Sequence, residues 1–346
     1  MSTLDQPLLI ANSNYHVGHQ IALAVAREQG YFRAEKLDAF DYESGGLIPG
    51  PLEKDGLALA MKNRGVDVAT AVDVEAAIVQ RARGAEVYIV GGWRYTPFLK
   101  WYGAKRVTGM GALRGGRIGM REKGGLVQVF VQDALRAAGV DPETQVEWVY
   151  DPVFGYRNSP AHADILRAGK IDAITSQTPY AEELEREGFP MILDPNKIFP
   201  RRPGKITVAT RRTIEERGAE LTAYFRAIIR SFWFMRDVGN FAYLKDLEAR
   251  LRKTNTHNED ERRLSIITSP DRLDSWALPV DGGAAPEAIA RIAAEMAAGG
   301  KLERALAAGE VLRGEAAAAA YREVSARPEL RPALATALAA VEKYGF

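Results

Sequence analysis

A glycine turn near the middle of the chain carries residues suited to holding an anion. Arg121 and Lys123 precede Gly124 and Gly125, and a helical apolar pattern begins directly after them. The first turn of a helix has backbone N–H groups without internal partners, and the helix dipole favours negative charge there. A guanidinium beside such donors can bind a carboxylate or a sulfonate. The turn predicts an anion site, with a sharp strand-to-helix turn as the equally good alternative.

A second basic candidate follows another glycine pair. Arg94 comes after Gly91, Gly92 and Trp93, and its guanidinium could hold the same kind of anion. A surface arginine in contact with water explains the residue equally well. Aromatic side chains at expected loops and strand ends could wall an aromatic or aliphatic ligand, or simply pack. They belong to Tyr15, Tyr42, Trp93, Phe154 and Tyr156.

Two histidines and two acidic residues offer further chemistry. His16 and His19 are three residues apart at an expected helix start and could face one ligand or one metal ion. The sequence shows no third and fourth metal ligand, so we expect no metal and no cofactor, and we favour His16 as a hydrogen-bonding contact. Asp73 and Glu75 could include a general base, but we favour a helix cap with first-turn charge.

The apolar pattern places these candidates at the ends of buried strands. Short apolar runs alternate with helical patterns along residues 8–92 and again along 117–193. This alternation predicts an α/β fold with mostly parallel sheets flanked by helices. Ligands of such sheets bind at the carboxyl ends of the strands. One of these strands is expected over Val87–Val90, ending at the glycine pair.

Two extended passages, Phe98–Tyr102 and Ile206–Thr210, divide the chain. They would let it cross to a second lobe and return, which predicts a two-lobed molecule with a ligand cleft and hinge closure. We therefore expect lobe 1 over residues 1–100 and lobe 2 over 101–205. Residues 206–346 should return to lobe 1 and add C-terminal helices.

The composition excludes several classes of protein. The 346 residues are 47% hydrophobic and 26% charged, with a net charge of +1. This near-neutral balance argues against nucleic-acid binding, which normally needs a basic excess. The apolar runs are too short for a membrane span. Because the chain has no cysteine, thiol catalysis, disulfides and cysteine-ligated metals are excluded.

The first residues, MSTLDQP, lack the basic and apolar regions of a signal peptide. The sequence as it stands predicts a cytoplasmic protein. A leader upstream of Met1 in the native gene would instead predict a periplasmic one.

Five blocks of the sequence resemble type II solute-binding proteins of the nitrate, sulfonate and taurine group, which includes the thiamine-pyrimidine-synthase-like proteins. The blocks are AVAREQGYFRAEKLDAFDYESGG at Ala24–Gly46, GVDVATAVDVEAAIVQRARGAEVYIVGG at Gly65–Gly92, LRGGRIGMREKGG at Leu113–Gly125, LRAGKIDAITSQTPYAEELEREG at Leu166–Gly188 and ITVATRRTIEERGAELTAYFRAIIRSFWFM at Ile206–Met235. The resemblance implies a two-lobed periplasmic-binding-protein-like type II fold, with the ligand held by loops that follow five strands.

By block position, the resemblance nominates ligand-binding residues in these loops. They are Asn12, Asn14, Tyr15, His16, Ser44, Gly45, Gly46, Asp73, Gly124, Gly125, Ser176 and Gln177. The family often has Ser or Thr at the turn where this chain has Gly124 and Gly125. Trp93, Arg94, Arg121 and Phe154, taken from the residue patterns, complete the expected site.

Two functions fit these features. The first is binding of a small organic anion, a sulfonate or a carboxylate that could be aromatic, as the solute-binding component of an ABC-type importer with its permease as partner. The alternative is a cytosolic enzyme on the same fold: a cysteine-independent decarboxylase, a desulfinase-like lyase or a pyrimidine-precursor enzyme. Its catalytic residues would be His16 and Asp73. The lack of a complete catalytic constellation favours binding, whereas the missing leader favours the enzyme.

Overall fold

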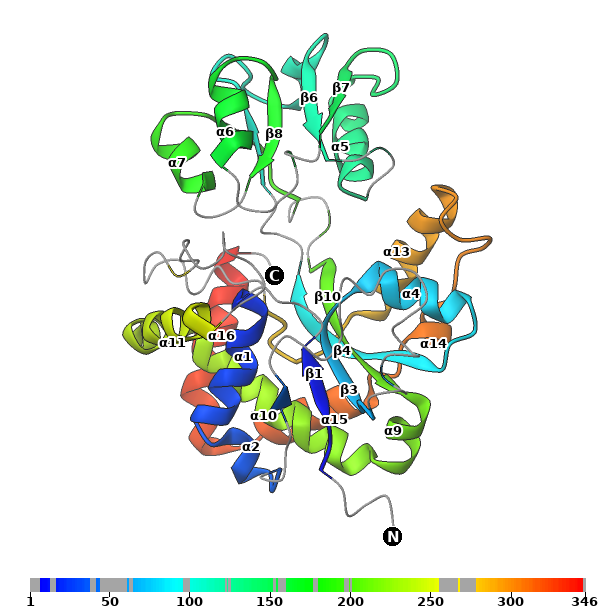
Figure 1. The fold of residues 1–346 in the computed structure, drawn as a ribbon, viewed down its shortest axis with the longest axis vertical. Helices are drawn as coiled ribbons and strands as arrows, with labels where there is room; N and C mark the ends of the chain where they lie inside the picture. Colours follow the sequence, from blue (N-terminus) through cyan, green and yellow to red (C-terminus); the bar gives the residue numbers. More distant parts are fainter. Residues whose placement is uncertain are drawn as a thin grey trace. The chain divides into compact units, whose positions relative to one another are not determined.

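A computed structural model of the chain describes residues 7–12, 17–37, 42–43, 61, 65–95, 100–121, 123, 126–151, 154, 160–176, 180–195, 199, 201–254, 267 and 278–344. The chain divides into two compact units, each described here by itself (Figure 1). Unit 1 comprises Met1–Tyr95, Arg201–Arg262 and Ile267–Phe346. Unit 2 comprises Thr96–Pro200 and Arg263–Ile266.

Unit 1 is built on a five-stranded sheet with the order β2-β1-β3-β10-β4. Its strands are β1 (Ile10–Asn12), β2 (Tyr42–Glu43), β3 (Val68–Asp73), β4 (Val87–Tyr95) and β10 (Pro203–Thr210). Strand β1 pairs in parallel with β2 and β3, whereas β10 lies antiparallel between β3 and β4. Four strands therefore run in one direction and β10 runs against them.

Helices cover both faces of this sheet (Figure 1). Those with ten or more residues are α1 (Val17–Glu28), α10 (Gly218–Arg236), α11 (Phe241–Thr254), α13 (Pro286–Ala298), α15 (Glu315–Ser325) and α16 (Arg331–Tyr344). The shorter ones are α2 (Tyr31–Ala34), α4 (Val74–Ala82), α9 (Arg211–Glu216) and α14 (Ala308–Val311), with 3-10 turns η4 (Val238–Asn240) and η6 (Pro328–Leu330). Helix α10 packs against α1, α15 and α16. Because α10 is buried along most of its length, it is the central core helix of unit 1.

Strand β4 lies at the edge of the sheet, but its free side is covered. The backbone N–H of Gly92 donates to the Gly282 carbonyl at 2.9 Å, and that of Arg313 donates to the Ile89 carbonyl at 2.8 Å. A Cβ atom on Gly92 would overlap with the Gly283 carbonyl oxygen. The glycine therefore allows another backbone to cross the strand closely. The expected end of the strand at this glycine pair is wrong, since β4 continues to Tyr95.

Unit 2 holds a second five-stranded sheet, with the order β7-β6-β8-β5-β9. Its strands are β5 (Lys100–Gly103), β6 (Arg117–Met120), β7 (Glu147–Tyr150), β8 (Ala173–Ser176) and β9 (Met191–Leu193). Its helices are α5 (Leu126–Ala137), α6 (Pro160–Arg167) and α7 (Tyr180–Arg186), with a 3-10 turn η2 (Met110–Leu113). Strand β6 is parallel to β7 and β8, and β5 is antiparallel to β8 and β9. The predicted α/β class, with two sheets flanked by helices, is confirmed.

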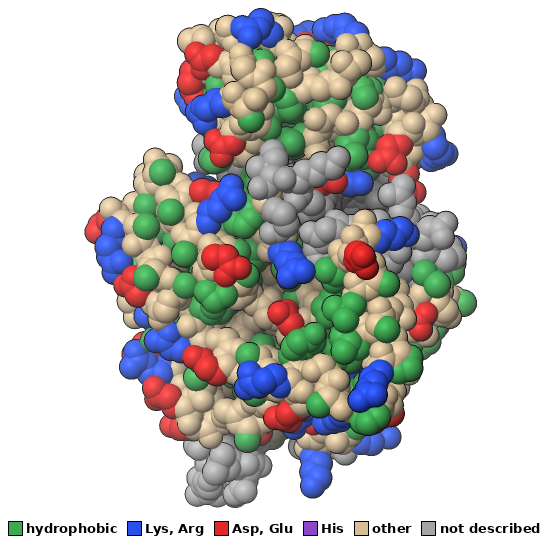
Figure 2. All heavy atoms as spheres, turned by 180° about the vertical axis from the view of Figure 1, so that it is seen from behind, with side chains coloured by type: hydrophobic (Ala, Val, Ile, Leu, Met, Phe, Trp, Pro, Cys, Tyr) green, Lys and Arg blue, Asp and Glu red, His purple; other side chains and the backbone are tan. Residues whose placement is uncertain are grey.

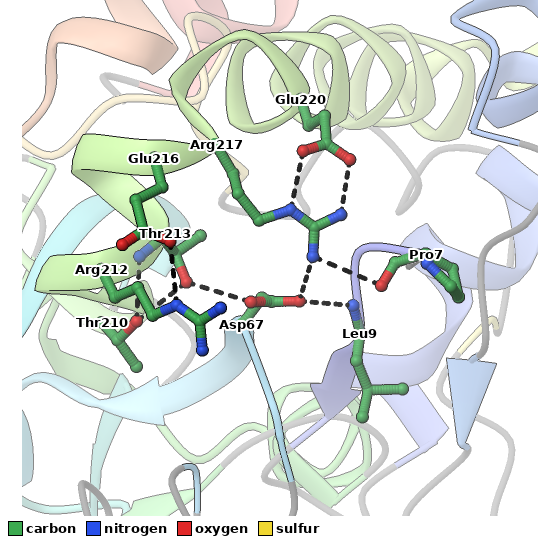
Figure 3. A network of polar contacts seen from close by, with 9 residues as sticks. All are labelled: Pro7, Leu9, Asp67, Thr210, Arg212, Thr213, Glu216, Arg217 and Glu220. Atoms are coloured by element: carbon green, nitrogen blue, oxygen red, sulfur yellow. Dashed lines mark hydrogen bonds and ion pairs between the residues drawn. The ribbon is translucent and has the colours of Figure 1, made fainter. Parts of the chain in front are cut away.

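An aspartate ties the amino edge of each sheet. In unit 1, Asp67 lies just before β3 and accepts hydrogen bonds from the Leu9 backbone N–H at 2.9 Å and from Arg217 at 2.7 Å (Figure 3). In unit 2, Asp172 lies just before β8 and accepts from the Arg117 backbone N–H at 2.8 Å and from Arg106 at 2.6 Å. These charge-assisted hydrogen bonds stabilise the amino edge of each sheet. The described candidates Asn12, Asp73 and Ser176 end their strands at the opposite, carboxyl edges.

The described surface carries charges of both signs. On the face drawn in Figure 2, basic and acidic side chains are interspersed in both units, without a broad area of one sign. Among the described residues, no helix is both long and apolar enough to cross a membrane.

Candidate functional site

Asn12 ends β1 at the carboxyl edge of the unit 1 sheet. Its side chain is buried, and its amide Nδ2 donates to the backbone carbonyl of His19 at 3.0 Å. This bond ties the end of β1 to the first turn of α1. Because the amide is held by the main chain, its orientation is fixed before any ligand binds.

Asp73 ends β3 at the same edge, and its carboxylate accepts a hydrogen bond from Lys205 Nζ at 2.5 Å. The residue occupies the N-cap position of α4, yet its side chain makes no cap hydrogen bond. The predicted N-cap position of Asp73 is confirmed, but its side chain pairs with Lys205 instead of making a cap hydrogen bond. A charged ammonium is a stronger partner for a carboxylate than a neutral backbone N–H, which explains the choice. Glu75, in the first turn of α4, pairs with Lys301 at 3.4 Å.

Arg94 lies near the end of β4, directly opposite Lys205 in the pairing of β4 with β10. The residue is partly buried rather than solvated, and burial lowers its pKa to about 10. Since this pKa is far above 7, the guanidinium stays charged at neutral pH. Arg94, Lys205 and Asp73 are thus three charged residues on neighbouring strands at the carboxyl edge of the unit 1 sheet.

Two aromatic candidates lie in the cores instead of at a ligand surface. Trp93 is 2% exposed and meets Phe232 of α10 edge to face, with ring centroids 5.6 Å apart. Phe154 is 3% exposed and packs in the unit 2 core against Gly119. Both residues serve packing, which corrects the expectation that they wall a ligand. Trp93 points inward because β4 continues through it, whereas the sequence pattern ended the strand earlier.

The carboxyl edge of the unit 2 sheet brings together predicted and unpredicted polar residues. Arg121 is exposed directly after β6, and buried Ser176 ends β8. Strands β6 and β8 are parallel neighbours that pair at Ile118 and Ala173, so both candidate residues follow or end strands at the same edge of the sheet. Buried Gln128, in the first turn of α5, donates to the hydroxyl of Tyr150 at 2.9 Å.

Sequence reasoning missed Lys205, Gln128 and Tyr150. Gln128 could have been found as the one polar side chain in the otherwise apolar first turn of a predicted helix. Lys205 had no such local signal, because its place between Asp73 and Arg94 depends on the insertion of β10 between two other strands.

Several expected site residues lie outside the described part of the chain. These are Asn14, Tyr15, His16, Ser44, Gly45, Gly46, Gly124, Gly125, Tyr156 and Gln177. His19 is described, and it is buried near the start of α1. Within the described ranges, no group of three or more His, Cys, Asp or Glu side chains is arranged to hold a metal ion.

The sequence matches the model of one protein family, described as the NMT1-like family, over residues 18–247. The chain belongs to the NMT1-like family. The match covers more than half of the protein and confirms the resemblance drawn from the five sequence blocks. A comparison with curated protein sequences finds no match.

Solved structures share the fold of this NMT1-like protein at low sequence identity. A putative sulfonate ABC transporter protein, the periplasmic sulfonate-binding protein SsuA from Methylobacillus flagellatus KT, superposes with a TM-score of 0.63 at 17% identity, over 94% of this chain and 97% of that one. The periplasmic nitrate-binding protein NrtA from Synechocystis PCC 6803 gives 0.61 at 12% identity, over 94% and 89%. The desulfurization enzyme DSZB gives 0.56 at 14% identity, over 91% and 99%. These likenesses establish the periplasmic-binding-protein-like fold.

Proposed function

We propose that this NMT1-like protein binds a small organic anion, a sulfonate or a carboxylate, as the solute-binding component of an ABC-type importer. The observation that carries the proposal is the gathering of cations and hydrogen-bond donors at the carboxyl edge of each sheet. Open α/β sheets bind their ligands at this edge. Structural neighbours named as sulfonate-binding and nitrate-binding proteins support the same role.

Each residue has a distinct task in this proposal. Arg94 and Lys205 supply positive charge at the carboxyl edge of the unit 1 sheet, and Arg121 supplies it at that of the unit 2 sheet. Ser176 and Gln128 supply neutral hydrogen bonds at the unit 2 edge. Among residues outside the described ranges, His16 remains a proposed hydrogen-bond donor, and the loop residues around it remain proposed contacts.

The partner and the compartment follow from the role. A receptor for an importer delivers its solute to a membrane permease, so the proposal includes an ABC permease as partner. It also requires export to the periplasm. Mapping the native translation start would show whether a leader precedes Met1.

An enzyme on this fold is the second candidate, favoured by the likeness to DSZB. One DSZB structure is that of a cysteine-to-serine variant in complex with biphenyl-2-sulfinic acid. The present chain has no cysteine, so it has no thiol for a reaction that would need one. Asp73, the described member of the proposed catalytic pair, is held in an ion pair by Lys205.

A thermal-shift panel tests the proposed function. The acids are hexanesulfonate, benzenesulfonate, hexanoate and benzoate, each matched with its neutral amide or sulfonamide, and nitrate is the inorganic control. A ligand at 100 times its dissociation constant stabilises the native state by about 2.7 kcal/mol, so a binding acid should raise the melting temperature clearly. We expect the acids to do so and the neutral analogues to have no effect.

Three results would contradict this expectation. Equal stabilisation by the neutral analogues would show that the site does not select anions. A preference for nitrate over every acid would show that the ligand is not an organic anion. Conversion of an acid during incubation, followed by NMR, would favour the enzyme.

A further inference from the structure

We propose that Lys205 is a ligand-binding cation of unit 1 and that Asp73 is its exchangeable counter-ion, displaced when an anionic ligand arrives. This inference rests on the proposed function and names a side chain that would bind the anion. Its observations are an unusual backbone conformation in β3, a row of three charged residues, and the unequal exposure of the Asp73 and Lys205 side chains.

The first observation is the backbone of β3. Ala71 is buried and has a φ of 56°, in the left-handed region that non-glycine residues rarely adopt. At this point the pairing of β3 with β10 shifts register, because two β3 residues face Thr207 alone. Strained residues of this kind persist where the surrounding structure requires them, and they gather at functional sites. Here the strain lies two residues before Asp73.

The pairing of β10 with β4 is irregular at the same edge. Its register shifts on both sides of Lys205, with Gly204 as the extra residue on β10 and Trp93 as the extra residue on β4. Bulges of this kind redirect side chains and are common beside binding sites. As a result, Lys205 pairs with Asp73 on one neighbouring strand and with Arg94 on the other.

The three residues form a charged row across β3, β10 and β4, with two cations and one carboxylate. The side chain of Asp73 is 65% exposed, whereas that of Lys205 is only 14% exposed. An ion pair with one partner so open to water is weak, because water competes for the carboxylate. An incoming sulfonate or carboxylate could replace the Asp73 carboxylate as the acceptor of the hydrogen bond from Lys205.

A simple structural ion pair is the alternative explanation. In that case the pair would only hold β10 to β3, and its removal would change stability without changing anion binding. The two explanations differ in whether Asp73→Asn tightens anion binding or leaves it unchanged.

The experiment measures dissociation constants by calorimetric titration. The probe is whichever of hexanesulfonate, benzenesulfonate, hexanoate and benzoate stabilises the wild type most. The variants are Lys205→Met, Asp73→Asn and the double variant. Arg212→Met is the charge-matched control, because Arg212 follows the opposite end of β10 and pairs with Glu216 at 3.0 Å (Figure 3).

Lys205→Met should weaken binding by roughly ten-fold or more, as expected for the loss of a hydrogen bond to a charged group. Asp73→Asn should tighten binding by about two- to five-fold, because the competing carboxylate is gone. In the Lys205→Met background, Asp73→Asn should give no further gain. Arg212→Met should leave the affinity unchanged.

The outcomes separate this inference from the proposed function. If the wild type binds none of the acids, both fall together. If it binds one and Lys205→Met binds it equally well, the inference alone is wrong. The inference alone is also wrong if Asp73→Asn weakens binding or leaves it unchanged, because Asp73 then has a structural role. It is wrong as well if Asp73→Asn tightens binding equally without Lys205, because Asp73 then acts by general repulsion.

Discussion

Trp93 fills space between β4 and α10 in unit 1. It is among the largest fully buried side chains in the described part of the chain, and its ring meets Phe232 edge to face. We expect Trp93→Ala to reduce the free energy of unfolding by about 3–5 kcal/mol, because it removes buried apolar surface and leaves a cavity. Urea unfolding followed by circular dichroism measures this loss. A loss below about 1 kcal/mol would show that the site collapses around the cavity and that Trp93 is no core residue.

At the residue scale, strand ends are the part of the site that sequence reasoning can reach. Asn12, Asp73 and Ser176 each end a strand, as the apolar pattern indicates. Lys205 lies outside the expected extended passage, which begins at Ile206, and its partners are more than 100 residues away in sequence. Periodicity reports which face of an element is apolar, but it carries no information about which distant strand lies beside it.

At the element scale, β4 and the crossing segment around Gly282 and Gly283 form a close backbone contact. Gly92→Ala should reduce the free energy of unfolding by about 1–3 kcal/mol, because the added Cβ overlaps with the Gly283 carbonyl oxygen and one backbone must move. Gly218→Ala is the matched control, since a Cβ there has open space and Gly218 begins α10. Denaturant titration of both variants tests the contact. Equal stabilities of the two variants would show that β4 accommodates the methyl group.

The elements themselves follow largely from local chemistry. Helix α5 ends at Ala137, and Gly139 follows in the left-handed conformation that commonly ends a helix. The predicted end of strand β4 is wrong, and the reason is not local. Two glycines normally indicate a turn, but here they permit a tertiary crossing by a segment almost 200 residues later in sequence. A local signal for flexibility does not distinguish these two uses.

At the scale of the whole molecule, each unit has a sheet and a core of its own. The unit 2 core cluster draws only on residues from Trp101 to Leu193, and the unit 1 core centres on α10. Units with separate cores can unfold as separate cooperative blocks. Substitutions in one unit should therefore affect the unfolding of that unit alone.

We expect calorimetry at pH 7 to show two transitions, with Gly92→Ala lowering one and Asp172→Asn lowering the other. Burial alone would raise the pKa of Asp172, but the hydrogen bonds from the Arg117 backbone N–H and from Arg106 outweigh it, so this pKa is lowered. A lowered folded-state pKa stabilises the protein above the unfolded value of about 3.9, and the stabilisation disappears as the pH falls through the folded value. The effect of Asp172→Asn should therefore be clear at pH 7 and shrink at pH 3, whereas the steric effect of Gly92→Ala should persist. A single transition that both substitutions lower equally would show that the two units unfold as one block.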